Sequence, residues 1–360
     1  MIRKDQKVLR FLAWLPARLY ELVVRLRVAA YETSYLKSRR LEPTVISVGN
    51  LTVGGTGKTP MVGYIARYLA EEGHDAAILT RGYGRNSTGL RTLNVEAKSS
   101  VPDYREFGDE AVMMSEWLPE IPILISGDRW DAGNWASREL KSNVLILDDA
   151  YQHLRVERDL NILLLDATDP FGGFEMVPFG RLREPLYGIK RADAVIVTRA
   201  DRPFDEHQTT SIIKHFCRAD VPILYFYSSL VKLRHLQTGD AYEISKFRGW
   251  NVAAMCGIGN PEAFADELLQ VGINIVAENF YKDHHPFSVN DLQTVAAGAT
   301  AAGADAIITT EKDAVRLRGI ELPETPVYAA VLELRSEDEV RFKSLLLRTV
   351  HRNAAELKKN

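Results

Sequence analysis

Cysteine is scarce in this chain of 360 residues, which contains only Cys217 and Cys256. Two cysteines so far apart provide no metal-binding cluster, and they argue against a structural disulfide, as expected in a reducing compartment. Long apolar runs are also lacking, since no stretch approaches the ~20 residues that a membrane-crossing helix needs. A strong net charge is lacking as well, and the value of -3 argues against a general nucleic-acid binder.

The composition is that of an ordinary globular protein, with 46% hydrophobic and 26% charged residues. A chain of this length and composition can bury a large core and is expected to form two domains. No sequence feature indicates an obligate protein partner.

Residues 1–40 are locally basic in a slightly acidic protein. Apolar residues recur there at helical spacing and predict an amphipathic helix that Pro16 starts or kinks. A cleavable signal is not expected, because charges interrupt the apolar stretch. The apolar face comprises Leu12, Leu15, Leu19, Leu22, Val23, Leu26 and Ala30, and the basic residues are Arg3, Lys4, Lys7, Arg10, Arg18, Arg25, Arg27, Lys37, Arg39 and Arg40.

Two interpretations of this segment stay open on the residues alone. One is a helix that lies in the membrane interface, where apolar burial and attraction of basic residues to anionic lipids would hold it. The other is an amphipathic helix that docks on the core of the same protein.

A glycine-rich stretch at residues 47–60 has the composition of a loop that holds a nucleoside triphosphate. The β-branched run Thr44–Val48 predicts a buried strand before it, and apolar residues at helical spacing over 61–69 predict a helix after it. In this geometry backbone N–H groups and the helix N-terminus surround the phosphates, while Lys58 and Thr59 would contact phosphate and magnesium. The candidate nucleotide-binding residues are Gly54, Gly55, Thr56, Gly57, Lys58 and Thr59.

The stretch departs from the G-x-x-x-x-G-K-[ST] pattern at one position. Thr52 stands where the first glycine is required, five residues before Gly57. Gly54 and Gly55 are expected to supply the flexibility that this glycine usually provides.

Two carboxylates end another predicted strand, over residues 143–147. Asp148 and Asp149 follow it directly, and a strand-terminal acid paired with a phosphate-loop threonine is the usual arrangement for magnesium across the β- and γ-phosphates. Two adjacent carboxylates repel each other, and a cation would relieve that repulsion. Gln152 and His153 come close behind them in sequence.

Other charged residues follow predicted strands or open predicted helices. Asp109 and Glu110 begin a helical pattern, where acidic residues often serve only as caps. Arg129 begins another helix just beyond a strand, and a long irregular passage contains Arg183 and Glu184, which suit stabilisation of a transferring phosphoryl group.

The chain past Pro222 changes character and predicts a second, smaller α/β unit reached through a β-hairpin around Gly239. Between its strands lies Asp283-His284-His285. These residues could bind a metal, but one short cluster is weak evidence for zinc, and a histidine that handles or orients a proton is at least as consistent with the pattern.

Several of these motifs, taken in order, resemble the tetraacyldisaccharide 4'-kinase family of lipid A biosynthesis over residues 10–335. Each motif is modest, but the combination is highly specific. The motifs are Ser47-Val48-Gly49-Asn50, Gly54-Gly55-Thr56-Gly57-Lys58-Thr59-Pro60, Arg81-Gly82-Tyr83-Gly84, Gly108-Asp109-Glu110, Leu147-Asp148-Asp149-Ala150-Tyr151-Gln152-His153, Leu182-Arg183-Glu184-Pro185, Gly257-Ile258-Gly259-Asn260-Pro261, Asp283-His284-His285 and Thr310-Glu311-Lys312-Asp313.

The resemblance implies transfer of the ATP γ-phosphoryl group to the 4'-hydroxyl of a tetraacylated disaccharide 1-phosphate, at the cytoplasmic face of a bacterial inner membrane. Asp109 would accept the hydroxyl proton, and His284, from the second domain, would orient it. Lys58, Arg129 and Arg183 would stabilise the transferring charge. The magnesium residues would be Thr59, Asp148 and Asp149, and further site candidates are Glu110, Gln152 and Glu184.

The lipid substrate also favours the membrane-interface interpretation of the N-terminal helix. The expected fold is a phosphate-loop kinase with a parallel sheet and helices on both faces, plus the smaller α/β domain. The expected division is 1–40, membrane-interface segment; 41–228, nucleotide-binding domain; 229–335, smaller domain; and 336–360, C-terminal helix.

Two rivals remain. A phosphate-loop ATPase of the partitioning or metallocentre-maturation type characteristically has a lysine before the double glycine, where this chain has Val53. A soluble small-metabolite kinase would not need residues 1–40. Ala150 stands where the family often has glycine, and this departure leaves the site assignments standing.

Overall fold

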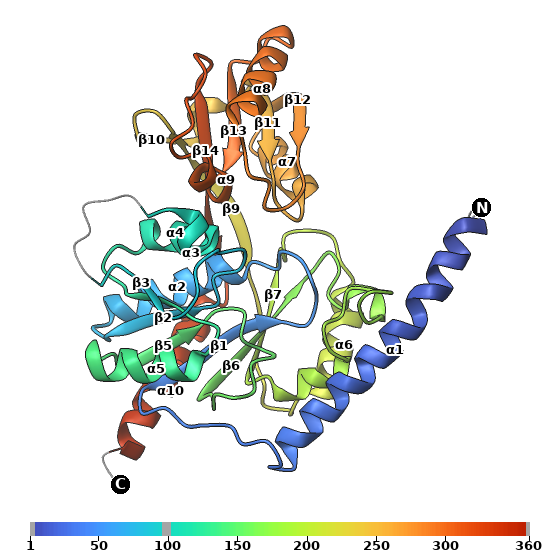
Figure 1. The fold of residues 1–360 in the computed structure, drawn as a ribbon, viewed down its shortest axis with the longest axis vertical. Helices are drawn as coiled ribbons and strands as arrows, with labels where there is room; N and C mark the ends of the chain where they lie inside the picture. Colours follow the sequence, from blue (N-terminus) through green and yellow to red (C-terminus); the bar gives the residue numbers. More distant parts are fainter. Residues whose placement is uncertain (1–3, 96–101, 358–360) are drawn as a thin grey trace.

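The computed structural model describes residues 4–95 and 102–357, with the side chains of 4–13 and 356–357 outside the described part (Figure 1). An eight-stranded sheet forms the larger unit, in the order β3-β4-β2-β5-β1-β6-β7-β8, and only β3 runs antiparallel to its neighbour. Its strands are β1 (Thr44–Asn50), β2 (Ala76–Thr80), β3 (Arg91–Leu93), β4 (Ile123–Ile125), β5 (Val144–Leu147), β6 (Leu160–Asp166), β7 (Ala194–Thr198) and β8 (Ile223–Tyr225).

Helices cover both faces of this sheet, as expected for a parallel sheet whose strands are apolar on both sides. One face packs against α2 (Lys58–Glu71), α4 (Asp109–Trp117) and α10 (Glu339–Leu357). The other packs against α1 (Lys4–Glu32), α5 (Arg129–Glu139) and α6 (Glu206–Phe216). The predicted helical face over 61–69 is fully buried, and complete burial of each such aliphatic side chain stabilises the fold by about 1.5–3 kcal/mol.

The smaller unit is a six-stranded sheet in the order β10-β9-β14-β13-β11-β12. Helix α7 packs on one face of this sheet. Helix α8 packs on the other face, together with residues that follow α9. The elements are β9 (Tyr227–His235), β10 (Ala241–Glu243), β11 (Asn251–Cys256), α7 (Pro261–Gln270), β12 (Asn274–Phe280), α8 (Val289–Ala301), β13 (Ala306–Thr310), α9 (Glu311–Arg316) and β14 (Val327–Arg335).

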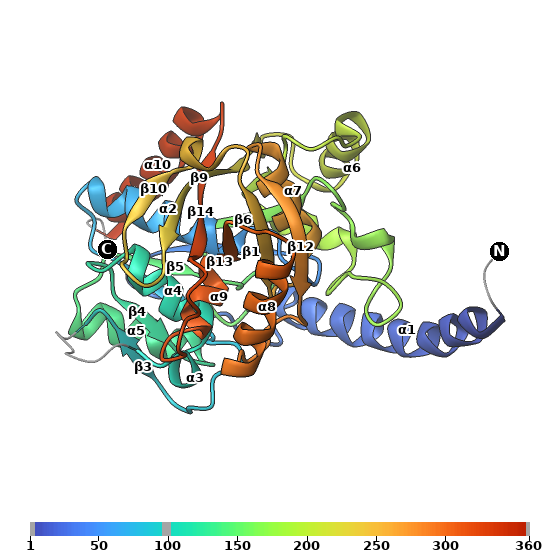
Figure 2. The same cartoon turned by 90° about the horizontal axis from the view of Figure 1, so that it is seen from above.

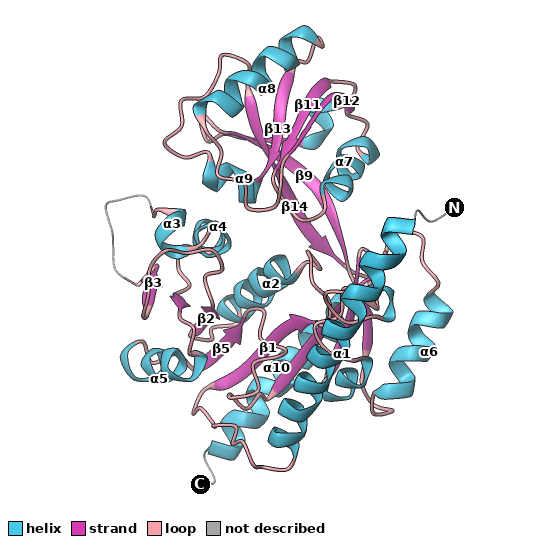
Figure 3. Cartoon of the chain, turned by 45° about the vertical axis from the view of Figure 1, so that its right-hand side comes forward, coloured by secondary structure: helices cyan, strands magenta, loops and turns pink. Residues whose placement is uncertain are grey.

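The predicted hairpin around Gly239 forms between β9 and β10. The strands that run between the two units are β9 and its antiparallel neighbour β14 (Figure 3). After β14 the chain returns to the larger unit as α10, which packs on α2 and β1.

Helix α1 keeps most of the predicted apolar face exposed where side chains are described, and Leu12 lies outside that part. Ala17 and Val28 are buried against the larger unit, whereas Leu19, Val23 and Leu26 remain 57%, 62% and 63% exposed. Pro16 lies inside the helix, and the N-terminal part extends beyond the body of the protein (Figure 2). No helix in the described ranges is long and apolar enough to cross a bilayer.

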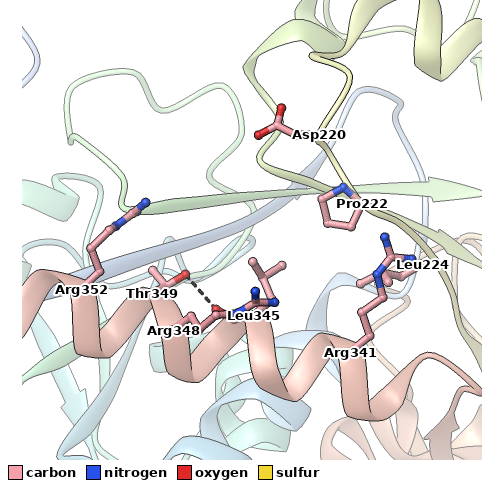
Figure 4. Close-up of a pocket in the computed structure, with 8 residues that line it drawn as sticks. All are labelled: Asp220, Pro222, Leu224, Arg341, Leu345, Arg348, Thr349 and Arg352. Atoms are coloured by element: carbon pink, nitrogen blue, oxygen red, sulfur yellow. Dashed lines mark hydrogen bonds between the residues drawn. The ribbon is translucent and has the colours of Figure 1, made fainter.

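A groove of about 440 Å³ lies between α10 and the start of β8 (Figure 4). Arg341, Arg348 and Arg352 of α10 line it together with Leu224 and Leu345. Leu224 belongs to the short strand β8, and the groove lies at the amino end of that strand. The groove is therefore away from the carboxyl edge of the sheet, where α/β proteins bind ligands. The site described next occupies that carboxyl edge.

Candidate active site

The phosphate loop joins β1 to α2, and glycines in it adopt backbone conformations that other residues disfavour. Gly57 precedes α2 at a φ of 76°, and Gly54 has a φ of 114°, both in the region that disfavours other residues. Asn50 donates a hydrogen bond from Nδ2 to Oγ1 of the buried Thr56 at 2.9 Å and fixes the loop from below. Gly55 lies between these glycines, and its carbonyl accepts from Arg199. The first turn of α2, which begins at Lys58, is therefore free to receive phosphate.

The threonine that breaks the expected pattern has a local structural explanation. Thr52 is buried and bridges Leu182 in an extended conformation, and the N–H of Val53 donates to the carbonyl of Arg181 at 2.8 Å. A β-branched residue suits an extended, paired backbone better than glycine does. The turn begins later, at Gly54.

Lys58 and Arg183 converge on one carboxylate. The Nζ of Lys58 lies 3.7 Å from Asp149 Oδ1, and Nη1 of Arg183 donates to both Asp149 oxygens at 2.9 Å. Burial raises the pKa of Asp149, but Lys58 and Arg183 outweigh it and leave the pKa below its usual value. These three predicted residues therefore form one charged group beside the phosphate loop.

Asp148 is the opposite case, a buried acid that forms no ion pair with the described residues and whose charge Lys58 offsets only in part. Its Oδ2 accepts a hydrogen bond from Thr80 at 2.9 Å, while its buried Oδ1 has no hydrogen-bond partner among the described residues. Burial, together with Glu110 and Asp149, raises the pKa of Asp148 to about 7. A magnesium ion at this carboxylate would relieve both the missing partner and the crowding of negative charge.

Magnesium fits this site only together with the nucleotide. In the described ranges, no three His, Cys, Asp or Glu side chains gather into a metal site of their own. Magnesium commonly takes one or two carboxylates and completes its shell with water and substrate phosphates, and Thr59, Asp148 and Asp149 suit that mode. The adjacent histidines diverge, since His284 contacts Asp109 and His285 contacts Asp291, so they do not form a zinc pair.

Asp109 meets His284 across the boundary between the two units. The Nδ1 of His284 lies 2.9 Å from Asp109 Oδ2, and Arg316 of α9 donates from Nε to the same oxygen at 2.9 Å. Burial, the strongest influence, raises the pKa of Asp109, but His284, Lys312 and Arg316 together lower it to about 2. Asp109 therefore stays an anion, held mainly by residues of the smaller unit.

Glu110 connects this acid to the phosphate loop. Thr59 donates from Oγ1 to Glu110 Oε2 at 3.2 Å, and Lys312 donates from Nζ to Glu110 Oε1 at 3.0 Å. The Asp109–His284 pair is therefore adjacent to the first turn of α2, where the terminal phosphate would lie.

Three predicted site residues take supporting positions. Gln152 donates to the carbonyl of Asn50 and to Glu184, both at 2.8 Å, and Glu184 is almost fully buried against Arg191. Arg129 is also buried, and its guanidinium donates to the backbone carbonyl of Asp148 at 3.3 Å. These hydrogen bonds hold the end of β1 and the backbone of the acidic pair in place.

Two charged residues of the site were not predicted from the sequence. Arg191 anchors Glu184, and Arg316 contacts Asp109 from the other unit. Arg316 had one local signal, because it follows Asp313 at i+3 on a helix, a spacing at which opposite charges pair.

Comparison with known proteins identifies the family of the chain. Residues 9–351 match the family model described as tetraacyldisaccharide-1-P 4'-kinase. The chain is 41% identical to the tetraacyldisaccharide 4'-kinase of Geobacter sulfurreducens, over 92% of this chain and 91% of that protein. It is 40% identical to the enzyme of the same name from Pelobacter propionicus, over 84% and 82%.

A solved structure is similar as well. A crystal structure of LpxK from Aquifex aeolicus in complex with ATP is 32% identical, with a TM-score of 0.74, covering 93% of this chain and 98% of that one. This chain therefore belongs to the tetraacyldisaccharide-1-phosphate 4'-kinase family.

Proposed function

We propose that this protein transfers the γ-phosphoryl group of ATP to the 4'-hydroxyl of a tetraacylated disaccharide 1-phosphate, giving the bis-phosphorylated lipid A precursor. Membership of the family supports the reaction. The observation that carries it is the contact between Asp109 and His284 beside a phosphate loop, with Glu110 bonded to Thr59 between them.

Position matters more than basicity for the acid that faces the acceptor hydroxyl. Phosphoryl transfer passes through a loose transition state, so catalysis depends mostly on alignment and on stabilisation of charge. Asp109, although its pKa is about 2, accepts the hydroxyl proton as the new P–O bond forms, and His284 orients its carboxylate. Lys58 and Arg183 stabilise the charge on the phosphoryl oxygens.

Magnesium would be held by Thr59, Asp148 and Asp149 together with the phosphates of ATP. When bound, the ion neutralises charge on the β- and γ-phosphates. Arg183, which pairs with Asp149, would lie beside the transferring group and stabilise its charge. Arg129 keeps the backbone of the acidic pair fixed.

The acceptor fits a groove of about 300 Å³ between α1 and the acidic pair. Tyr20, Val24 and Val28 of α1 form one side, and the opposite side ends at Asp149 and Arg183. A groove with apolar side chains on α1 and cationic side chains around it suits an anionic sugar headgroup with acyl chains. The other cationic side chains of the groove are Arg27, Arg81, Arg129 and Arg191.

A direct assay tests the proposal. Incubation of the protein with labelled ATP, magnesium and tetraacyldisaccharide 1-phosphate should give a labelled, bis-phosphorylated lipid. Absence of that product would refute the function. A product formed only from a soluble sugar would favour the small-metabolite kinase, and ATP hydrolysis without transfer would favour the partitioning-type ATPase.

Helix α1 provides a second prediction, because its exposed apolar face would insert at the cytoplasmic face of the inner membrane. The double change Leu19→Glu and Val23→Glu should weaken binding to anionic phospholipid vesicles by more than about tenfold, since each buried side chain contributes ~1.5–3 kcal/mol. ATP binding should not change. Vesicle co-sedimentation measures the first quantity and calorimetry the second.

A matched control for α1 lies on another helix. Val340 of α10 is 78% exposed, and Val340→Glu should leave vesicle binding intact. Equal binding by the α1 double variant and the wild type would mean that α1 does not contact the membrane. Because Ala17 and Val28 are buried in the larger unit, the double variant preserves packing that deletion of residues 1–40 would remove.

A further inference from the structure

Helix α9 of the smaller unit presents two cations, one turn apart, to two consecutive carboxylates of α4. Lys312 contacts Glu110, and Arg316 contacts Asp109. The two helices pack directly against each other. The proposed proton acceptor and its neighbour are therefore both held from the other side of the boundary between the units.

Arg316 is the more buried of the two cations, and its guanidinium hydrogen-bonds through Nε and Nη1. It is only 2% exposed. The Nε donates to Asp109 Oδ2 at 2.9 Å, and Nη2 makes an ion-pair contact of 2.9 Å with the same oxygen. The Nη1 donates to the carbonyl of Gly257 and to Asp313 Oδ1, both at 2.8 Å.

Asp313 in turn is fixed within the smaller unit. Its Oδ2 accepts from the N–H of Gly257 at 3.1 Å and from Oγ1 of Thr310 at 2.7 Å. The carbonyl of Gly257 also accepts from the N–H of His284 at 3.1 Å. Arg316 and His284, the two groups on Asp109 Oδ2, are thus aligned by one residue, Gly257.

These contacts leave the Asp109 carboxylate little freedom to rotate. Its Oδ2 faces Arg316 and His284, and its Oδ1 accepts the N–H of Glu110 at 2.8 Å. A displacement of about 1 Å in a reacting group can cost ~10²-fold in rate. A residue that sets the position of this oxygen therefore controls the reaction without touching the substrate.

We propose that Arg316 is a positioning residue: anchored by Asp313 and the Gly257 carbonyl, it holds the Asp109 carboxylate in its reactive orientation across the boundary between the two units. This inference rests on the proposed phosphoryl transfer for its kinetic consequence. Its structural consequence, the immobilisation of the first turn of α4, does not depend on the substrate.

Steady-state kinetics of Arg316→Gln test the kinetic consequence. We expect kcat to fall by about 10²-fold while KM for ATP changes by less than about twofold, because the phosphate loop is untouched. Arg316→Lys keeps the charge but loses the planar guanidinium with its several N–H donors, so it should retain an intermediate kcat. In an Asp109→Asn background, Arg316→Gln should lower the residual rate by less than about twofold, since the two residues act as a unit.

Arg318→Gln is the matched control. Arg318 also pairs across the same boundary, with Glu116 of α4, but it does not touch Asp109. Its removal should leave kcat unchanged. Equal losses in Arg316→Gln and Arg318→Gln, or an undiminished effect of Arg316→Gln in the Asp109→Asn background, would reduce Arg316 to a structural contact and overturn the inference.

Loss of Arg316 leaves Asp313 as a buried charge without its cation, which can destabilise the smaller unit. The double variant Arg316→Gln with Asp313→Asn removes both charges and keeps the test valid if the single variant unfolds. It should show the same fall in kcat.

Hydrogen exchange separates this inference from the proposed function. Exchange of the Glu110 amide, which donates to Asp109, should be about tenfold faster in Arg316→Gln than in the wild type, and unchanged in Arg318→Gln. If the wild type transfers no phosphoryl group but exchange responds in this way, the function fails and the positioning role stands. Unchanged exchange at Glu110 contradicts the positioning role whatever the activity.

Discussion

Replacing Asp109 by alanine should lower the rate of phosphoryl transfer by about 10²- to 10⁴-fold, the usual contribution of a positioned proton acceptor. ATP binding should persist, because Asp109 contacts His284 and Arg316 and not the phosphate loop. Transfer is measured with labelled ATP and the tetraacyldisaccharide 1-phosphate, and ATP affinity by calorimetry. A large loss of kcat at nearly constant affinity identifies an interaction that matters in the transition state.

Two comparisons make this result specific. Asp103, the N-cap of the preceding short helix, accepts a backbone hydrogen bond from Arg105, so Asp103→Ala should affect local stability without affecting transfer. His284→Ala should be milder than Asp109→Ala, with a loss of about tenfold, since Arg316 still holds the carboxylate. Near-normal turnover by Asp109→Ala would contradict the assignment of Asp109 as the proton acceptor.

The strands of the larger sheet were predictable because their burial is nearly complete. Strand β5 begins one residue after the predicted 143–147 and ends with it, and β1 extends the predicted 44–48 by two residues. Continuous apolar runs of this kind are the pattern that parallel strands with two covered faces require. Short edge strands carry no such signal, so β3 and β8 were not predicted.

Residues of the site that belong to one continuous segment were also predictable. The phosphate loop and the acidic pair that ends β5 each have a recognisable local pattern, and the resemblance to the kinase family paired Asp109 with His284. Contacts such as that of Arg316 with Asp109 join residues 207 positions apart in the chain. They depend on how the two units pack, which neither periodicity nor spacing encodes.

Residue type alone also did not show which of the charged candidates are buried and which face the phosphate loop. Glu184 and Arg183 are adjacent in sequence, yet Glu184 is buried against Gln152 and Arg191 while Arg183 faces Asp149. Both residues lie in a bend of an irregular segment, where no regular alternation predicts which side chain is buried. A list of site residues drawn from sequence therefore does not separate buried charged side chains from accessible ones.

Asp148→Asn should abolish most of the activity and, at the same time, stabilise the nucleotide-free protein at alkaline pH. Asparagine cannot replace a carboxylate beside magnesium, and loss of such an electrostatic contact should cost about 10²-fold or more in kcat. It does keep an oxygen to accept from Thr80. The gain in stability comes from removing a buried negative charge that Lys58 offsets only in part.

The pH dependence of this gain follows from the raised pKa. Burial, Glu110 and Asp149 raise the pKa of Asp148 from 3.8 to about 7 in the folded protein. The folded state therefore binds a proton that the unfolded state has released, so the stabilising effect is complete below about pH 3.8 and is lost as the pH rises through 7. Asp148→Asn lacks this loss, and its advantage over the wild type should grow between pH 6 and pH 8.

Thermal unfolding of the nucleotide-free proteins across this pH interval measures the effect. We expect the Tm of Asp148→Asn to exceed that of the wild type at pH 8 by several degrees. Asp149→Asn is the matched control, because Lys58 and Arg183 already compensate Asp149 and its pKa is lowered, so its removal should not raise the Tm. Magnesium with ATP should stabilise the wild type more than Asp148→Asn, since the ion relieves the charge that the substitution removes. A Tm difference that stays constant from pH 6 to pH 8 would contradict the view that Asp148 is a strained acid kept for magnesium.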